Sequence, residues 1–133
     1  RGVDGFRLDA ARHLIAAGPG ELQNDPPETH AYWREFSRYL RERYPESLML
    51  GEIWSDTETV ATYYGDAETF PCGDEFAMTF NFGLAGGVVS AVNLGDANAV
   101  TSVLSRMSRF YPQDVLDGTF LANHDMTRLA TQS

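Results

Sequence analysis

Segments typical of strands and of helices alternate along this chain, and that alternation constrains the fold more than any other feature of the sequence. Four short apolar runs are typical of buried strands, and they cover residues 3–8, 48–51, 76–82 and 119–122. The segments between them carry apolar residues at helical spacing. Because strands that alternate with helices form βαβ units, we expect an α/β fold with a parallel sheet.

The connecting segments contain recognisable helix boundaries. The first helix is expected to begin at Asp25-Pro26, with the aspartate as N-cap, and to end before Pro45. Its apolar face repeats every three or four residues and consists of Trp33, Phe36, Leu40 and Tyr44. Ser55 and Glu58 form a candidate capping box for a second, shorter helix.

A last helix is expected between Asp96, its N-cap, and Pro112, where a helix cannot continue. Four strands with their helices make about half of a (β/α)8 TIM barrel, a fold of ~250 residues. No repeat, linker or low-complexity tract marks a boundary inside the chain. We therefore expect residues 1–133 to be a fragment of a single barrel domain.

Three of the strand-like runs lead into an acidic residue. Asp9 follows the first run and Glu52 the second, while Asp125 follows the fourth through Asn123 and His124. A single acid after a strand is commonly a helix N-cap or a solvated loop residue. In a parallel barrel, however, the carboxyl ends of all strands lie on one face, which carries the chemistry. The three acids are therefore expected to converge in one pocket.

Converging carboxylates repel one another, so their protonation states should differ. Arg7 lies two residues before Asp9, on the same side of the strand, and its positive charge should keep Asp9 ionised. Glu52, crowded by acids and close to the apolar ring of Trp54, should have a raised pKa. One ionised and one protonated acid is the pair that glycoside hydrolysis requires.

The segments around these acids resemble three signature regions of the alpha-amylase family, glycoside hydrolase family 13. Residues 5–13 (GFRLDAARH) resemble the second region, residues 51–54 (GEIW) the third and residues 120–125 (FLANHD) the fourth. Their order and separation fit strands four, five and seven of the family's catalytic barrel. The resemblance extends over essentially the whole chain and implies a partial barrel of about strands four to seven.

The resemblance also implies a role for each matching residue. Asp9 matches the nucleophile, Glu52 the general acid/base and Asp125 the third carboxylate, which binds sugar hydroxyls. Arg7 matches the arginine that orients the nucleophile, and His124 the histidine that hydrogen-bonds the sugar in the cleaved subsite. The implied reaction is retaining hydrolysis of α-1,4-glucosidic bonds in starch-type glucans or maltooligosaccharides by double displacement.

Four more residues are candidates for substrate contact. Arg12 and His13 resemble the basic residue–histidine pair of α-1,4-acting amylases, with an ordinary helix-start pair as the alternative. The backbone carbonyl of His13 matches a calcium ligand of many relatives, so calcium is a candidate cofactor, and no organic cofactor is expected. Trp54 is expected either to stack on a glucose ring or to lie in the core. Asn123 is expected to bind substrate with its neighbouring histidine.

Composition narrows the class of partner. Ten basic and nineteen acidic residues give a formal net charge of −9, which argues against a nucleic-acid partner. Residues 77–95 carry no charge but include glycines and asparagines, so we expect a buried strand and a packed helix there, not a membrane span. Cys72 is the only cysteine, so no internal disulfide can form, and the compartment stays open.

Two alternatives to an α-1,4-glucan hydrolase remain at this point. One is an α-glucosidase or transglycosidase of the same family, because Ala10 after the nucleophile is compatible with α-1,4 preference without requiring it. The other is a non-catalytic relative that keeps the barrel for binding. Such relatives usually lose one or more of the acids, and this chain has all three.

Overall fold

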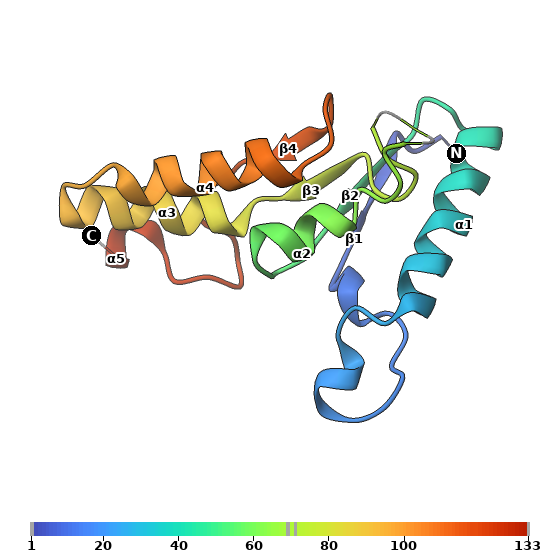
Figure 1. The fold of residues 1–133 in the computed structure, drawn as a ribbon, viewed down its shortest axis with the longest axis horizontal. Coiled ribbons are helices and arrows are strands. Elements are labelled where there is room, and N and C mark those ends of the chain that lie inside the picture. The colour runs from blue at the N-terminus through green and yellow to red at the C-terminus, as the bar shows by residue number, and fades with distance from the viewer. Residues whose placement is uncertain (1, 69, 71, 133) are drawn as a thin grey trace.

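A four-stranded parallel sheet organises the computed structural model, which describes residues 2–68, 70 and 72–132 (Figure 1). The strands are β1 (Gly5–Leu8), β2 (Leu48–Gly51), β3 (Met78–Phe80) and β4 (Leu116–Gly118). Their order in the sheet is their order in the chain. Such sequential winding is that of a barrel, whereas a doubly wound sheet reverses its strand order at a switch point.

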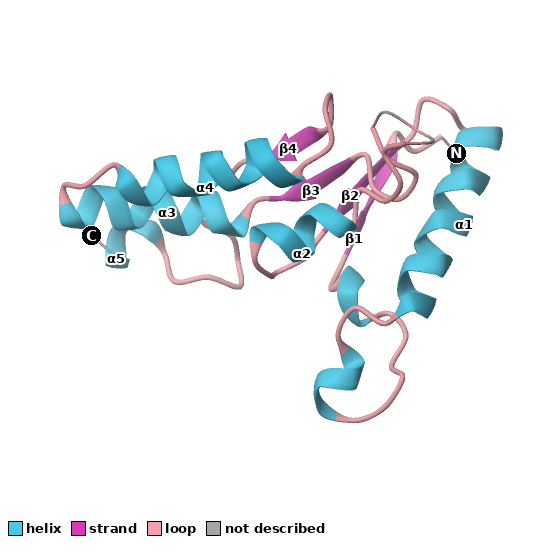
Figure 2. Cartoon of the chain, in the orientation of Figure 1, coloured by secondary structure: helices cyan, strands magenta, loops and turns pink. Residues whose placement is uncertain are grey.

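Helices connect consecutive strands (Figure 2). Between the strands lie α1 (Pro27–Arg43), α2 (Thr57–Thr62), α3 (Phe82–Leu94) and α4 (Asn98–Phe110). The short turns η1 (Ala11–His13) and η2 (Gly20–Gln23) precede α1, and α5 (Leu129–Gln132) follows β4. The pair α3 and α4 pack side by side at the end of the sheet opposite α1 (Figure 1). The expected α/β class with a parallel sheet is confirmed.

The uncharged stretch 77–95 forms β3 and then α3, the strand and packed helix expected there. In the part of the chain that the structure describes, no helix combines the length and the apolarity needed to cross a bilayer.

Two helix caps lie one residue away from the predicted positions. Asp56, and not Ser55, caps α2, because its Oδ1 accepts the backbone N–H of Thr59 at 2.8 Å. The predicted capping box is therefore wrong. At the start of α4, the carboxylate of Asp96 accepts the N–H of Asn98 at 2.9 Å from just before the N-cap position.

The start of α1 differs more. Its N-cap is Pro26, which provides no side-chain hydrogen bond, so the N-cap predicted at Asp25 is wrong. Asp25 has a positive φ of 53° and forms an ion pair with Arg12 instead. The predicted end of the helix is confirmed, since Tyr44 is the C-cap and Pro45 follows it.

The last strand precedes the predicted one, and the strand predicted at 119–122 is wrong. β4 was not predicted because it contains Asp117 and Gly118, and both residue types are depleted in strands. Here Asn81 Nδ2 donates to both carboxylate oxygens of Asp117 at 3.0 and 3.2 Å. A Cβ on Gly118 would lie 2.8 Å from the carbonyl oxygen of Thr79, so only glycine fits this strand pairing.

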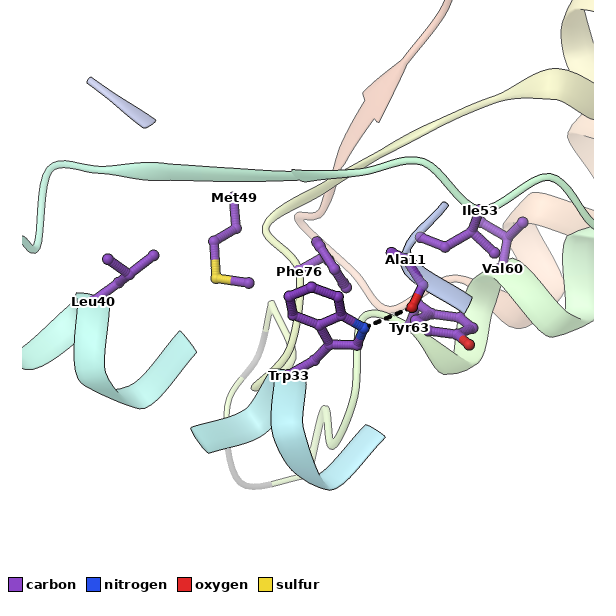
Figure 3. Packing of buried hydrophobic residues seen from close by; sticks show 8 residues of the cluster. All are labelled: Ala11, Trp33, Leu40, Met49, Ile53, Val60, Tyr63 and Phe76. Carbon is purple, nitrogen blue, oxygen red and sulfur yellow. Dashed lines mark hydrogen bonds between the residues drawn. The ribbon is translucent and has the colours of Figure 1, made fainter. Parts of the chain in front are cut away.

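A buried hydrophobic cluster packs between the sheet, α1 and α2 (Figure 3). Its members are Ala11, Trp33, Leu40, Met49, Ile53, Val60, Tyr63 and Phe76. Ala11 and Ile53 are fully buried and lie just beyond Asp9 and Glu52 in sequence. Trp33 Nε1 donates to the carbonyl oxygen of Ala11 at 2.9 Å. The core therefore anchors the two segments that follow β1 and β2.

Candidate active site

The register of β1 and β2 sets two acids side by side. Leu8 pairs with Gly51, so Asp9 and Glu52 both follow directly at the C-terminal end of the sheet. The carbonyl oxygen of Leu8 accepts the N–H of Glu52 at 3.0 Å, and that of Glu52 accepts the N–H of Ala11 at 3.1 Å. These bonds continue the strand pairing beyond the sheet, so the backbone fixes where the two side chains begin.

Arg7 connects the two acids. Its Nη1 donates to Asp9 Oδ1 at 2.8 Å, and its Nη2 donates to Glu52 Oε2. The expected ion pair of Arg7 with Asp9 is confirmed, and the second contact adds Glu52 to it. The Asp9 side chain is 73% exposed, whereas that of Glu52 is 10% exposed. One carboxylate therefore faces solvent and the other lies against the protein.

The pKa of Glu52 is raised above its ordinary value, as the sequence analysis predicted. Burial is the largest cause, and a hydrogen bond with the carboxyl of Asp9 adds to it. The positive charge of Arg7 and the backbone N–H of Ala10 lower the same pKa without cancelling the increase. Glu52 is therefore suited to hold a proton that it can donate.

The backbone is strained directly after Asp9. Ala10 has φ 43° and ψ 43°, the left-handed region that residues with a Cβ rarely adopt. Strain of ~1–3 kcal/mol of this kind persists only where the surrounding structure enforces it, and it is frequent at functional sites. Here Ala10 lies between Asp9, which directly follows β1, and the fully buried Ala11.

The third acid lies apart from this pair. Asp125 Oδ2 contacts His124 Nε2 at 3.0 Å, and the Asp125 N–H donates to Asn123 Oδ1 at 3.0 Å. The side chains of His124 and Asp125 are 72% and 50% exposed. Within the described ranges, no hydrogen bond or ion pair joins Asp125 to Asp9 or Glu52. The convergence of all three acids stays a prediction.

The guanidinium of Arg12 is held by the protein. Its Nε donates to Asp25 Oδ1 at 3.1 Å, its Nη2 to Asp25 Oδ2, and its Nη1 to the carbonyl oxygen of Trp54 at 2.9 Å. The hydroxyl of Tyr63 also donates to Asp25 Oδ1, at 2.7 Å. Asp25 was not predicted from the sequence as a site residue. No local signal marks it, because it lies 13 positions from its partner and resembles a helix cap.

His13 and Trp54 are the two other candidate residues in these segments. The N–H of His13 donates to the carbonyl oxygen of Ala10 at 2.9 Å. The indole of Trp54 stacks on Phe82 with ring centroids 4.6 Å apart and an interplanar angle of 10°, and Trp54 is 51% exposed. Trp54 is therefore partly packed and partly open, between the two alternatives that its sequence left.

The residues present do not form a complete calcium site. Calcium takes six to eight oxygen ligands, and the carbonyl of His13 would supply one of them. Within the described residues, no group of three or more His, Cys, Asp or Glu side chains is arranged to hold a metal ion. Calcium binding at His13 stays a prediction.

A parallel sheet that presents a solvated and a buried carboxyl at the ends of neighbouring strands has the arrangement of a barrel glycosidase. The family model described as alpha amylase, catalytic domain, matches residues 1–133, and the chain belongs to the alpha-amylase family.

Similar proteins agree with this assignment. Alpha-amylase 3 of Dictyoglomus thermophilum is 31% identical over 98% of this chain and 23% of its own length. The trehalose synthase/amylase TreS of Mycolicibacterium smegmatis is 33% identical over 93% of this chain and 20% of its own. The crystal structure of an alpha-amylase from H. orenii matches with a TM-score of 0.73 and 29% identity, over 98% of this chain and 25% of that one. The chain thus spans a quarter or less of these relatives.

Proposed function

We propose that this chain carries the nucleophile and the general acid/base of a retaining enzyme that acts on α-glucans. The single observation that supports this most is the guanidinium of Arg7, which binds the exposed carboxylate of Asp9 and the buried carboxyl of Glu52 together. Two carboxyls on one guanidinium lie close to each other, and retaining glycosidases need their pair only ~5–5.5 Å apart. An inverting pair would need a wider gap that holds a water molecule.

The proposed reaction has two displacements. In the first, a carboxylate oxygen of Asp9 attacks the anomeric carbon of the sugar, and the bond to the leaving oxygen breaks as Glu52 donates its proton to that oxygen. In the second, Glu52 takes a proton from water, whose oxygen attacks the anomeric carbon and releases Asp9. Each displacement inverts the centre, so the product keeps the α configuration.

The remaining residues are proposed to bind sugar. Asp125, His124 and Asn123 form one hydrogen-bonded group, and in our proposal they contact hydroxyls of the sugar in the cleaved subsite. Trp54 offers its open indole surface to a glucose ring, since aromatic faces pack against apolar sugar faces. His13 is proposed to line the leaving-group side.

The proposal places the chain within one catalytic barrel domain, at about strands four to seven. The sequential parallel order of the four strands supports this placement, and so does the match to a catalytic-domain family model over residues 1–133. The substrate proposed is a starch-type glucan or a maltooligosaccharide with α-1,4 bonds. The relative alpha-amylase 3 supports it, and no part of the proposal requires an organic cofactor.

A transglycosidase is the second candidate. Several relatives are trehalose synthases, one of them 33% identical over 93% of this chain. Such an enzyme would use the same first displacement and then give the glucosyl group to a sugar hydroxyl in place of water. The two candidates therefore differ in the acceptor and share the residues that form the intermediate.

The test uses the full-length protein and a series of maltooligosaccharides. Asp9→Asn and Glu52→Gln should each lower kcat at least ~10³-fold, because each removes a group that reacts. The matched control is Glu58→Gln, which alters an exposed glutamate paired with Arg106 and should leave kcat unchanged. Short products identify a hydrolase, and longer or isomerised products identify a transglycosidase. Unaltered activity in Asp9→Asn or Glu52→Gln, or a wild type inactive on every α-glucan, would overturn the proposal.

A further inference from the structure

We propose that Arg12, locked onto Asp25, is a positioning residue that holds the Glu52–Trp54 segment at its working distance from Asp9. This inference rests on the proposed function, because it names what sets the geometry of the same two carboxyls. It assigns a role to Asp25, which no sequence motif marked.

Among the described residues, three hydrogen bonds to backbone carbonyl oxygens join the segment after β1 to the segment after β2, in addition to the side-chain contacts of Glu52 with Arg7 and Asp9. The first two are backbone bonds, from the N–H of Glu52 to Leu8 and from the N–H of Ala11 to Glu52, at 3.0 and 3.1 Å. The third is the bond from Arg12 Nη1 to the carbonyl oxygen of Trp54 at 2.9 Å. It lies farther along the chain from the two strands than the first two bonds, and its donor is a side chain.

Asp25 holds the guanidinium of Arg12 that donates this third hydrogen bond. Both carboxylate oxygens of Asp25 accept from the Arg12 guanidinium, and the N–H of Asp25 donates to the carbonyl oxygen of Arg12 at 3.1 Å. The hydroxyl of Tyr63, a fully buried residue, donates to the same carboxylate at 2.7 Å. The side chains of Arg12 and Asp25 are only 16% and 23% exposed. A two-oxygen contact of this kind restricts the direction of a guanidinium as well as its position.

The charge on Arg12 is secure in this setting. Its pKa is raised, chiefly by the hydrogen bond to Asp25, so the guanidinium stays protonated at any working pH. Three of its five N–H groups are already used by Asp25 and Trp54. A residue so occupied is better suited to hold the protein than to recognise a sugar.

One buried residue separates Trp54, whose carbonyl Arg12 holds, from Glu52, whose carboxyl is proposed to react. Ile53 lies between Trp54 and Glu52 and is fully buried in the core (Figure 3). Because the core holds Ile53 and Arg12 holds the carbonyl of Trp54, the backbone that follows Glu52 is fixed at two successive residues. Misplacement of a reacting group by about 1 Å can cost ~10²-fold in rate.

The test is Arg12→Lys in the full-length protein, since lysine keeps the charge but loses the two-oxygen fork. We expect kcat to fall ~10–100-fold with KM changed less than about threefold. The basic limb of the pH–rate profile, which reports the proton on Glu52, should move to lower pH. The reason is that burial and the nearby Asp9 raise the pKa of Glu52, and both effects weaken when the segment relaxes.

Two further variants separate positioning from other roles. Asp25→Asn keeps the size of the side chain and should produce the same fall in kcat and the same shift of the basic limb, because Asp25 is proposed to act through Arg12. The double variant should be no worse than either single one, because the residues act as a unit. The matched control is Arg106→Lys, which breaks the similar fork on Glu58 and should leave kcat and the profile unchanged.

The outcomes are distinct. A higher KM with unchanged kcat and an unmoved basic limb in Arg12→Lys would make Arg12 a substrate contact and overturn the inference. If the wild type cleaves no α-glucan, the proposed function fails. Crystal structures of the wild type, Arg12→Lys and Asp25→Asn then decide the inference, which predicts displaced Trp54 carbonyl and Glu52 carboxyl groups. Unmoved groups in both variants would overturn it.

Discussion

The acids that follow the first two strands are positioned differently from the acid that follows the last strand. At the ends of β1 and β2, Asp9 and Glu52 each follow a paired strand residue and share one guanidinium, and each precedes a fully buried residue by one or two positions. Beyond β4, Asp125 lies in an irregular segment, and no described residue after Gly118 is buried. The first pair is positioned by strand register and core packing, and the third acid by a loop.

The part of the proposed site at β1 and β2 is therefore positioned by the fold itself, whereas the part after β4 depends on further contacts. Strand register fixes the direction of a side chain, because a shift of one residue in the pairing would turn that side chain to the other face of the sheet. A solvated loop has no such constraint, so its acid can reach the pair only when substrate or other protein groups hold the loop. We therefore expect variants at the ends of β1 and β2 to affect Glu52 differently from variants in the segment after β4.

The largest effect that sharpens this comparison is expected from Asp125→Asn. Loss of the third carboxylate should lower kcat/KM ~10²–10³-fold, the scale of other single groups that stabilise a transition state. The basic limb of the pH–rate profile should nevertheless stay in place, because Asp125 does not contact Glu52. Kinetics across pH on a maltooligosaccharide check this. A basic limb that moves would place Asp125 beside the pair and break the comparison.

A smaller loss of rate, but a clear shift with pH, is expected from Arg7→Met. Without the guanidinium, Asp9 loses its ion pair with Arg7 and is held less firmly in position, so kcat should fall ~10–100-fold. The positive charge of Arg7 lowers the pKa of Glu52, so its removal should move the basic limb to higher pH. This direction is opposite to that expected for Arg12→Lys. The same pH series measures both, and shifts of equal sign would contradict the account.

The smallest effect concerns stability. Because the folded state raises the pKa of Glu52, the folded protein binds this proton more tightly than the unfolded chain does. At pH values above the folded pKa, the ionised carboxyl therefore costs stability. Glu52→Gln should increase the free energy of unfolding by about 0.5–2 kcal/mol at neutral pH, in the range of single stabilising substitutions at strained active sites.

That gain should disappear as the pH falls below the ordinary pKa of glutamate, where the carboxyl is protonated in both states. Denaturant unfolding at several pH values measures it. Glu58→Gln is the matched comparison of opposite sign, because Arg106 lowers the pKa of Glu58. It should give no gain at neutral pH. A Glu52→Gln variant that is less stable than the wild type at neutral pH would show that burial does not strain this carboxyl.

Much of the arrangement at the ends of β1 and β2 could be predicted from sequence, for a simple reason. A short apolar run followed by an acid reads directly as a buried strand with its carboxyl end marked, and the two-residue spacing of Arg7 and Asp9 predicts their pairing. The contacts that cross between segments could not be predicted. Arg7 meets Glu52 across 45 positions and Arg12 meets Trp54 across 42, distances over which local patterns carry no signal.

The segment around β4 was predicted less well. The apolar residues at 119–122 favour a strand, but the sheet pairs the segment before them. Asp117 is tolerated there only because Asn81 binds its carboxylate, which is a tertiary contact that overrides strand propensity. Asp25 was misassigned for a related reason, since a helix cap and an ion-pair partner look alike in sequence.

The central claim is that Asp9 attacks the sugar while Glu52 supplies the proton. Its most direct test is to trap the glycosyl-enzyme with a fluorinated α-glucosyl fluoride, which slows the second displacement, and to locate the label by mass spectrometry of peptides. The account predicts one glucosyl group on the peptide that contains Asp9, lost in Asp9→Asn. A label on Glu52 or elsewhere, or turnover that inverts the anomeric centre without any label, would contradict it.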